Sequence, residues 1–279
     1  MHFLMYDRFF LSILEVIYVK RDIFSCSKRY SSVAKKFREI MYDENHYELF
    51  PQIISKYSND LIKGLKYSNS KDFYLITPDI TSWIIKNQKD FNDEKLFYIF
   101  PSVNNSLETD YIFGVEIIND ENAEIKILNI LIKLLDSLKI NFFIDISSVL
   151  IWKNLLKDEF SLKIIECIQK KNTNKLKNLI KDEKTKDNII SLLSKRGKVL
   201  NYEPFKEIKN KINDKRIIYD PSNFIYNDYY FDLIFEIYSS DGTIIGNGGN
   251  YIINGNKSCG FNLSFDNITK IIWSDLNEK

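Results

Sequence analysis

The sequence predicts an α+β fold in which an antiparallel sheet is flanked by helices and interrupted by a helical insert. Apolar residues alternate with a period of two in several segments and recur at helical spacing in others. Only helical patterns and turns occur from about residue 158 to 213, and strand patterns separated by Asp-Gly and Asn-Gly turns follow. With 279 residues, 44% of them hydrophobic, the chain can bury a large core, so we expect a single domain over residues 1–279.

The first half of the chain alternates between helix and strand. Ser31 is a suitable cap for a helix over residues 31–42, and a short strand over residues 46–51 follows it. The next strand leads to Thr77 as a helix cap and to Pro78 at the first helical position. The further expected elements are strands over residues 95–103, 108–118 and 141–146, and helices over residues 122–138 and 147–156.

The helical insert carries an excess of positive charge. From residue 163 to 198 it holds eleven Lys or Arg residues against four Asp or Glu residues. One interpretation is a nucleic-acid-binding face; the other, which we favour, is the solvated side of amphipathic helices, because no set of aromatic residues interleaves the lysines. Over the whole chain 39 basic residues nearly balance 38 acidic ones, so neither nucleic acid nor a membrane is an expected partner.

The cysteines and histidines predict neither a metal site nor a disulfide framework. They are few and widely spaced, without CxxC grouping: Cys26, Cys167, Cys259, His2 and His46. We therefore expect no metal and no cofactor. The apolar run over residues 9–19 contains Glu15 and is shorter than the roughly 20 residues that span a bilayer, so we expect a cytoplasmic protein with an amphipathic first helix.

Two segments in the last part of the chain together indicate a pocket. NDYYFDLIFEIY, at residues 227–238, is followed at residues 246–251 by GNGGNY. Paired as antiparallel strands, they would supply tyrosine side chains as walls and a glycine-rich backbone as a floor. Taken alone, the tyrosines are more simply explained by cross-strand packing, and the glycines by a bulge or a tight bend.

Seven segments, taken in order, resemble a known family. They are HYELFP, LITPDIT, LFYIFPSV, DYIFGVEI, DYYFDLIFEIY, GNGGNY and CGFNLSFD. The chain from about Lys35 to Asn267 is similar to the catalytic core of histidyl-tRNA synthetase and its paralogues, which belong to the class II aminoacyl-tRNA synthetases. No match to the anticodon-binding domain of the synthetases follows, so the resemblance is to the short paralogue, the regulatory subunit of ATP phosphoribosyltransferase.

The resemblance implies a histidine-like pocket. Its residues would be Asp79, Thr81, Glu116, Tyr230, Tyr251, Gly248 and Gly249. By the family pattern, the first two would meet a ligand ammonium and the glutamate an imidazole, while the tyrosines would form walls beside the glycines. A simpler interpretation of Asp79 is that its carboxylate offsets the macrodipole at the start of a helix.

The departures from the family pattern concern the groups that hold negative charge. Arginines that contact ATP in the synthetases align with Asn104 and Asn267, and the glutamine and arginine that hold the amino acid's carboxylate align with Ile112 and Ile225. Losing one donor of this kind typically costs about 10²–10³ in rate, so the resemblance implies a protein without catalytic residues and without amino-acid activation.

The resemblance therefore implies a regulatory subunit, needed for the activity and the histidine feedback control of ATP phosphoribosyltransferase in the first step of histidine biosynthesis. The implied partners are the short-form catalytic subunit, in a hetero-octamer, a second copy of this chain in a dimer, and L-histidine. Two alternatives remain: a divergent histidyl-tRNA synthetase-like enzyme that activates an amino acid, and a nucleic-acid-binding accessory subunit that uses the lysine-rich insert.

Overall fold

The computed structural model describes residues 27–57, 65–68, 71–76, 79–103, 109–198, 201–225 and 227–277. Its centre is an eight-stranded mixed sheet with the strand order β1-β5-β6-β11-β10-β9-β7-β8. The strands are β1 (Tyr47–Glu48), β5 (Lys95–Val103), β6 (Thr109–Ile117), β7 (Phe142–Ser148), β8 (Ile217–Tyr219), β9 (Tyr230–Ser239), β10 (Ile244–Ile253) and β11 (Asn256–Ser264). The two edge strands, β1 and β8, run parallel to their neighbours, and all other pairs are antiparallel.

Strand β11 joins the two halves of the sheet. It pairs with β6 on one side, where Cys259 lies opposite Ile117, and with β10 on the other, where Gly260 lies opposite Gly249. The strands before it in the sheet order come from the first half of the chain and those after it from the second half. The sheet is therefore continuous only through this strand.

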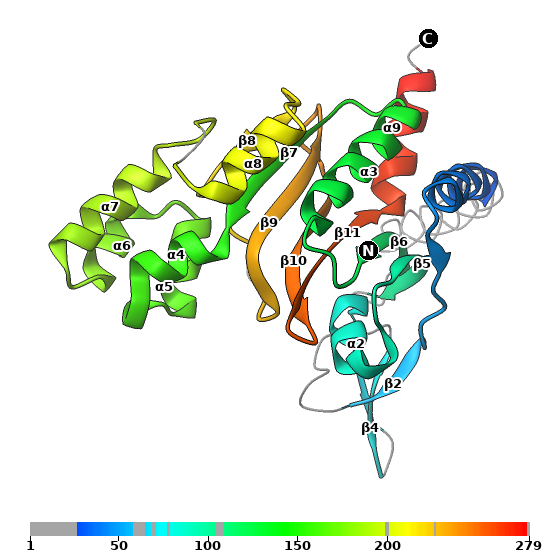
Figure 1. Cartoon of the computed structure of the whole chain (residues 1–279), viewed down its shortest axis with the longest axis horizontal. Coiled ribbons are helices and arrows are strands. Elements are labelled where there is room, and N and C mark those ends of the chain that lie inside the picture. The colour runs from blue at the N-terminus through cyan, green and yellow to red at the C-terminus, as the bar shows by residue number, and fades with distance from the viewer. Residues whose placement is uncertain are drawn as a thin grey trace, which may run out of the picture.

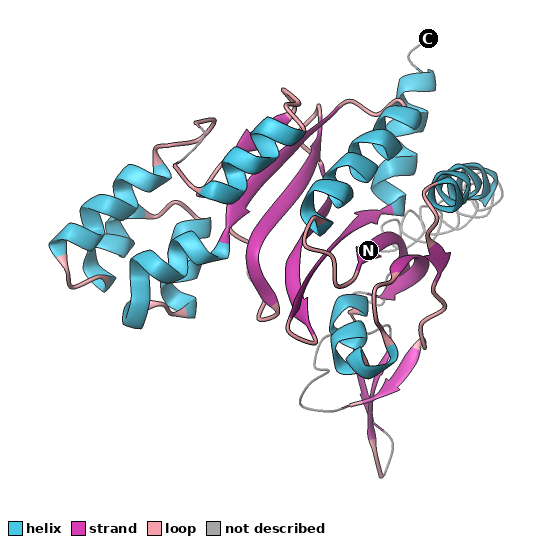
Figure 2. Cartoon of the chain, viewed as in Figure 1, coloured by secondary structure: helices cyan, strands magenta, loops and turns pink. Residues whose placement is uncertain are grey.

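One face of the sheet is covered by helices that lie side by side (Figure 1). They are α3 (Ala123–Ser137), α8 (Glu203–Lys211), α9 (Phe265–Asn277) and a helix over residues 27–43. Side chains at alternate strand positions, such as Leu233, Phe235 and Ile237 of β9, point toward these helices and form the main core with them. The strands form one continuous layer behind this helical layer (Figure 2).

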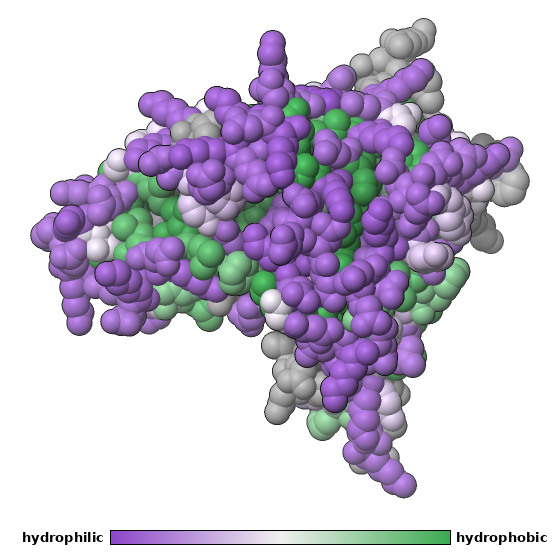
Figure 3. Space-filling model, in the orientation of Figure 1, coloured by the Kyte–Doolittle hydropathy of each residue, from purple (hydrophilic) through white to green (hydrophobic). Residues whose placement is uncertain are grey.

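The other face of the sheet carries two smaller cores. Helices α4 (Val149–Leu156), α5 (Leu162–Gln169), α6 (Thr173–Leu179) and α7 (Glu183–Leu193) pack together and reach the sheet at Tyr230 and Ile234 of β9. Helix α2 (Ile80–Lys86) packs over β5 and β10 through Ile80 and Ile84. In the space-filling view, hydrophilic residues cover most of the visible surface, and apolar residues show between the helices and over the α4–α7 group (Figure 3).

Most elements agree with the sequence-based expectations. The α+β class is confirmed, and the expected strands and helices between residues 95 and 156 are found with small shifts at their ends. The two hairpin turns are also confirmed: Gly242 has a φ of 86°, while Asn254 and Gly255 have φ values of 49° and 81°. Positive φ at both central residues is the geometry that Asn-Gly turns favour.

The predicted start of helix α2 is wrong. The helix begins at Ile80, and its cap is Asp79, whose Oδ1 accepts a hydrogen bond from the Ser82 amide at 2.7 Å. Thr77 and Pro78, the predicted cap and first helical residue, lie outside the described residues. An aspartate at this position satisfies one of the free amide groups of the first turn.

Two features were not predicted. Helix α9 follows β11 without a turn, and β2 (Ile54–Lys56), β3 (Leu65–Ser68) and β4 (Phe73–Ile76) form a separate three-stranded sheet in the order β2-β4-β3. In addition, the predicted strand over residues 46–51 is reduced to the two residues of β1.

The boundary of the helical insert stays a prediction. The structure shows that α8 does not pack with α5, α6 and α7, because its buried Phe205 and Ile208 belong to the main core on the opposite face of the sheet. The predicted amphipathic helix over residues 9–19 lies outside the described residues. Among the helices that are described, none has the length and apolar content to cross a membrane.

Candidate functional site

Glu116 lies at the centre of a buried cluster of hydroxyl groups. It is on β6, on the face that carries α2, and is only 1% exposed. Its Oε1 accepts a hydrogen bond from Thr81 Oγ1 at 2.9 Å and lies 3.4 Å from the Tyr98 hydroxyl, while its Oε2 accepts one from the Tyr251 hydroxyl at 2.7 Å. Residues from four elements, α2, β5, β6 and β10, therefore meet at one carboxyl group.

Burial raises the pKa of Glu116 to about 7, because a carboxylate is costly to remove from water. The hydrogen bonds from Tyr251, Thr81 and Tyr98 act in the opposite direction, since they favour the charged form, and nearby Asp79 raises the pKa further. Burial also raises the pKa of the Tyr98 and Tyr251 hydroxyls well above the usual range, so both stay protonated and act as donors. The cluster can therefore hold or release a proton near neutral pH.

The predicted tyrosine walls do come together. Tyr230 of β9 lies directly opposite Tyr251 of β10, and both are buried. The ring of Tyr229 lies edge-on to both, with centroids 4.8 Å from Tyr230 and 6.4 Å from Tyr251. The Tyr229 hydroxyl is 3.4 Å from Oδ2 of Asp79, which links this wall to the start of α2. The structure thus brings together the tyrosines, Asp79, Thr81 and Glu116.

The predicted glycine floor is covered by side chains of the chain itself. Of the two predicted floor glycines, Gly249 faces the cluster, where a Cβ would lie 2.7 Å from the ring of Tyr230. Gly248 faces the main core on the opposite side of the sheet, where a Cβ would overlap the ring of Phe235. A Cβ at Gly114 would overlap the ring of Tyr98, and one at Gly260 would overlap the carboxyl group of Glu116. The absent side chains at these positions provide room for the buried rings and the carboxyl group.

Strand β9 has a bulge opposite the end of this floor: Ile234 pairs with Gly249 and Tyr230 with Tyr251, so three β9 residues lie opposite one β10 residue. The pairing with β9 shifts register between Gly249 and Tyr251, so that Asn250 has no direct partner on β9. The Asn250 side chain instead accepts a hydrogen bond from the Asp232 amide at 2.8 Å and donates one to Glu124 at 2.6 Å. Along β10, which pairs regularly with β11, Tyr251 lies two residues from Gly249 and therefore on the same face of the sheet as Glu116.

The positions that the resemblance assigns to phosphate and carboxylate binding carry no charge. Asn267 donates a hydrogen bond from its side chain to the Ile244 carbonyl at 3.0 Å. Ile112 and Ile225 are partly buried and pack against apolar side chains of the two smaller cores. Asn104 lies outside the described residues. Among the described residues, no group of three or more His, Cys, Asp or Glu is arranged to hold a metal ion.

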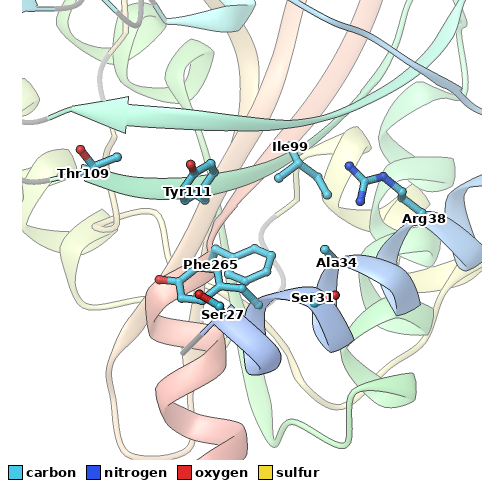
Figure 4. A pocket seen from close by; sticks show the side chains of 9 residues that line it. Ser27, Ser31, Ala34, Arg38, Ile99, Thr109, Tyr111 and Phe265 are labelled. Atoms are coloured by element: carbon cyan, nitrogen blue, oxygen red, sulfur yellow. The ribbon is translucent and has the colours of Figure 1, made fainter. Parts of the chain in front are cut away.

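A cavity of about 650 Å³ lies on the face of the sheet opposite the Glu116 cluster (Figure 4). Ser27, Ser31 and Ala34 of the helix over residues 27–43 form one side, and strand residues Ile99 and Tyr111 form the other. Because Phe265 at the start of α9 packs between them, with its ring stacked 4.3 Å from that of Tyr30, the cavity is largely apolar. It contains none of the predicted site residues.

Sequence reasoning missed two sets of residues. Tyr98 belongs to the Glu116 cluster. The feature that could have predicted this is its position in a strand that pairs with the glycine-containing strand DYIFGVEI. A second cavity, of about 330 Å³, is lined by Asp145, Arg196 and Asp220. The sequence feature that could have indicated this cavity is Asp145, a charged residue inside the apolar strand NFFIDI. Burying such a carboxylate is costly unless a cation or a hydrogen-bond donor contacts it.

Comparisons with known proteins give no match at the level of sequence. No family model matches the chain, and no curated protein matches it either. Solved structures do match. The chain superposes on an ATP phosphoribosyltransferase regulatory subunit/histidyl-tRNA synthetase from Bacillus halodurans with a TM-score of 0.72 and 16% identity, over 88% of this chain and 79% of that one. The chain has a class II synthetase-like fold.

Two further structures share this class II synthetase-like fold. A chain of the HisG:HisZ ATP phosphoribosyl transferase complex from Thermotoga maritima matches with a TM-score of 0.68 and 17% identity, over 85% of this chain and 97% of that one. A histidyl-tRNA synthetase from Nostoc matches with a TM-score of 0.67 and 11% identity, over 89% of this chain and 72% of that one. In the class II synthetase-like sheet described above, the Glu116 cluster lies on the face that carries α2 and the α4–α7 group.

Proposed function

We propose that this chain is a non-catalytic regulatory subunit of ATP phosphoribosyltransferase, needed for activity and for histidine feedback control of the first step of histidine biosynthesis. The observation that supports it most is the chemistry of the Glu116 cluster. The groups that most affect this carboxyl group are hydroxyls and a second carboxylate, namely Tyr251, Thr81, Asp79 and Tyr98. The central cluster of this class II synthetase-like fold is made of carboxyl and hydroxyl groups. Such a cluster does not attract phosphate, and it is suited to regulation rather than to phosphate chemistry.

The argument against amino-acid activation is electrostatic. Forming an aminoacyl adenylate develops negative charge on the α-phosphate, and fixed cations or donors must already be in place to stabilise it. Asn267 is neutral, and its side-chain amide is engaged with the Ile244 carbonyl. A neutral amide that is already hydrogen-bonded cannot replace a guanidinium group.

The proposed partner is the short-form catalytic subunit of ATP phosphoribosyltransferase, in a hetero-octamer that contains dimers of this chain. The fold similarity to a chain of the HisG:HisZ complex supports this partner. Exposed apolar side chains around β1 and β2 support self-association: Tyr47 is 72% exposed, Phe50 81%, Ile53 53% and Ile54 57%. Leu49, by contrast, is partly buried against the core around α2, so it does not belong to this patch.

The proposed histidine site is the Glu116 cluster with Asp79, Thr81, Tyr230, Tyr251, Gly248 and Gly249. Its support is a carboxyl group that titrates near neutral pH and could pair with an imidazole. Because Tyr98, Tyr230 and Tyr251 are at most 5% exposed, these rings have to move to admit a ligand. We therefore propose weak binding to the isolated chain and tighter binding in the assembly, where the partner can stabilise an open form.

The role is tested by co-purifying the chain with the short catalytic subunit and measuring phosphoribosyl transfer with and without histidine. We expect activity that depends on this chain and that histidine inhibits. The isolated chain should show no histidine-dependent exchange of pyrophosphate into ATP. Exchange above background that is lost in Glu116→Gln would overturn the proposal in favour of an amino-acid-activating enzyme.

The histidine site is tested in the same complex with Glu116→Gln. The substitution keeps the side-chain volume and removes the charge, and a charged hydrogen bond is worth about 1.5–3 kcal/mol. We expect half-inhibition to require roughly tenfold more histidine. Phosphoribosyl transfer measured without histidine should be unchanged. An inhibition curve that coincides with that of the unmutated complex would place histidine elsewhere.

A further inference from the structure

A second polar cavity lies where the α4–α7 group meets the sheet. Its volume is about 330 Å³, at the lower end of the range for small-molecule sites. The charged and amide residues that line it come from β7, β9, the chain after β8 and the ends of α5 and α7. They include Asp145, Lys171, Arg196, Asp220, Asn223 and Glu236.

Carboxylates outnumber cations around this cavity. Arg196 bridges Asp145, at 2.9 Å, and Asp220, and the Lys171 ammonium lies 3.9 Å from Asp220. Glu236 adds a third carboxylate, which accepts a hydrogen bond from the Tyr238 hydroxyl at 2.5 Å. Two cations thus face three carboxylates, so the cavity can accept one further positive charge.

One of these carboxylates is buried with an oxygen that lacks a partner. Asp145 is 2% exposed; its Oδ2 pairs with Arg196, while its Oδ1 has no hydrogen-bond partner among the described residues. Burial raises the pKa of Asp145, and Asp220 and Glu236 add to this effect, whereas Arg196 opposes it. Leaving a buried acceptor unpaired costs about 1–3 kcal/mol, and more when the group is charged.

An unpaired donor lies on the same cavity. The side-chain nitrogen of Asn223 is buried and has no acceptor within the described part of the chain. The residues around it are already engaged: Asp220 accepts hydrogen bonds from both the amide and the hydroxyl group of Ser222, and Gln169 donates one to the Phe224 carbonyl. The cavity therefore offers one free acceptor and one free donor.

A purely structural role explains only part of this arrangement. The bridge through Arg196 ties the end of α7 to β7 and to the chain after β8, which accounts for Asp145 Oδ2 and for Asp220. It accounts neither for Asp145 Oδ1 nor for the Asn223 nitrogen. A metal ion does not account for them either, because no metal-binding group of side chains is found among the described residues.

We propose that this cavity binds a small organic cation that also carries a hydrogen-bond acceptor, and that the ligand is a free amino acid. Its ammonium group donates to Asp145 Oδ1 and to Glu236. Its carboxylate accepts from Asn223 and faces Arg196, whose side chain is 51% exposed and can therefore reach a ligand. This site is separate from the Glu116 cluster, and its occupation does not require a partner subunit.

The test is direct binding to the full isolated chain. The standard L-amino acids other than histidine are titrated individually by calorimetry at neutral pH, and histidine is left out because its proposed site is the Glu116 cluster. We expect at least one to bind, and its N-acetyl derivative, which lacks the ammonium group, to bind at least about tenfold more weakly. If no amino acid binds at millimolar concentration, the proposal is wrong.

Two variants and a control locate the site. Asp145→Asn and Glu236→Gln each remove one carboxylate and should weaken binding at least about tenfold, while Asp182→Asn, at the exposed cap of α7, should bind as the unmutated chain does. Circular dichroism checks that each variant is folded, and if Asp145→Asn is not, the partly exposed Glu236 decides the outcome. Unchanged affinity in the folded variants overturns the proposal. Because the catalytic subunit is absent, this result is independent of the regulatory role.

Discussion

The carboxyl group of Glu116 is buried among hydroxyl groups, and its burial determines how it responds to pH. Its pKa is about 7 in the folded chain, against an ordinary value of 4.5. Between these values the folded chain binds more protons than the unfolded chain, so the free energy of unfolding falls as pH rises. The stabilisation is fully present below pH 4.5 and is lost as the pH passes through about 7.

We therefore expect Glu116→Gln to remove a pH-dependent part of the stability. Relative to the variant, the wild-type chain should lose about 2–3 kcal/mol of unfolding free energy between pH 5 and pH 8. Urea unfolding at several pH values measures this difference. Glu39→Gln, on the exposed side of the helix over residues 27–43, serves as the control and should keep the wild-type pH dependence. A Glu116→Gln curve parallel to that of the wild type would contradict the expectation.

The glycines of the cluster make a second residue-level prediction. Gly114→Ala would place a methyl group where the ring of Tyr98 lies, and overpacking of this kind typically costs about 1–3 kcal/mol. Tyr98→Ala removes that ring, so Gly114→Ala should cost much less unfolding free energy in a chain that already carries Tyr98→Ala. A double-mutant cycle of unfolding free energies measures the coupling. Strictly additive effects would show that the ring and the glycine do not share this space.

Among the elements, helix α2 carries the residue with the most ambiguous role. Asp79 caps the helix through the Ser82 amide and also faces the Tyr229 hydroxyl. Its place at the cap fits the simpler interpretation of this residue, while its contact with Tyr229 fits ligand recognition. Asp182 gives a matched comparison, because it caps α7 through the Thr185 amide at the same distance of 2.7 Å, at an exposed position.

We expect Asp79→Ala and Asp182→Ala each to cost about 1 kcal/mol of unfolding free energy, because both lose a cap. Only Asp79→Ala should also raise the histidine concentration needed for half-inhibition of the complex. Urea unfolding and inhibition curves for both variants separate the two roles. An inhibition curve for Asp79→Ala that matches that of Asp182→Ala would leave Asp79 as a cap alone.

The success of the sequence analysis also differs between elements. Strand β5 and helix α3 were predicted almost to the residue, because β5 is a compact apolar strand and α3 buries one apolar stripe against the sheet. Strand β4 was predicted as the strand before helix α2, whereas β2 was not, because it has only three residues and exposes Ile54, so alternation gives no burial signal. Helix α9 follows β11 directly, without a Gly or Pro to separate the two patterns.

The candidate site could be predicted only as a set of residues. The family order brought Glu116, Thr81 and the tyrosines together correctly, since strand pairing follows from topology. That Tyr98 occupies the space above Gly114 depends on the rotamer of one ring and on the shape of the sheet, which no local pattern encodes. The cavity at Asp145 depends on contacts between residues 51 positions apart, such as the pair that Asp145 forms with Arg196.

At the scale of the whole molecule, the apolar patch around β1 and β2 makes a prediction about assembly. We expect Phe50→Glu to convert a dimer of the chain into a monomer, because Phe50 is 81% exposed and a charge there would have to be buried in the interface. Multi-angle light scattering measures the mass. Leu162→Glu on α5, where the leucine is 66% exposed outside this patch, is the matched control and should stay dimeric. A wild-type chain that is monomeric at every concentration would exclude this interface.

The position of β11 has a consequence for how the protein is made. Its residues, 256–264, are synthesised after those of every other strand, yet they lie between β6 and β10 in the sheet. During translation the two halves of the sheet therefore emerge with open edges, each a template for pairing with another chain. Closing the sheet requires contacts between residues far apart in sequence, which slows folding. Newly made chains should thus depend on chaperones until this last strand leaves the ribosome and inserts between the two halves.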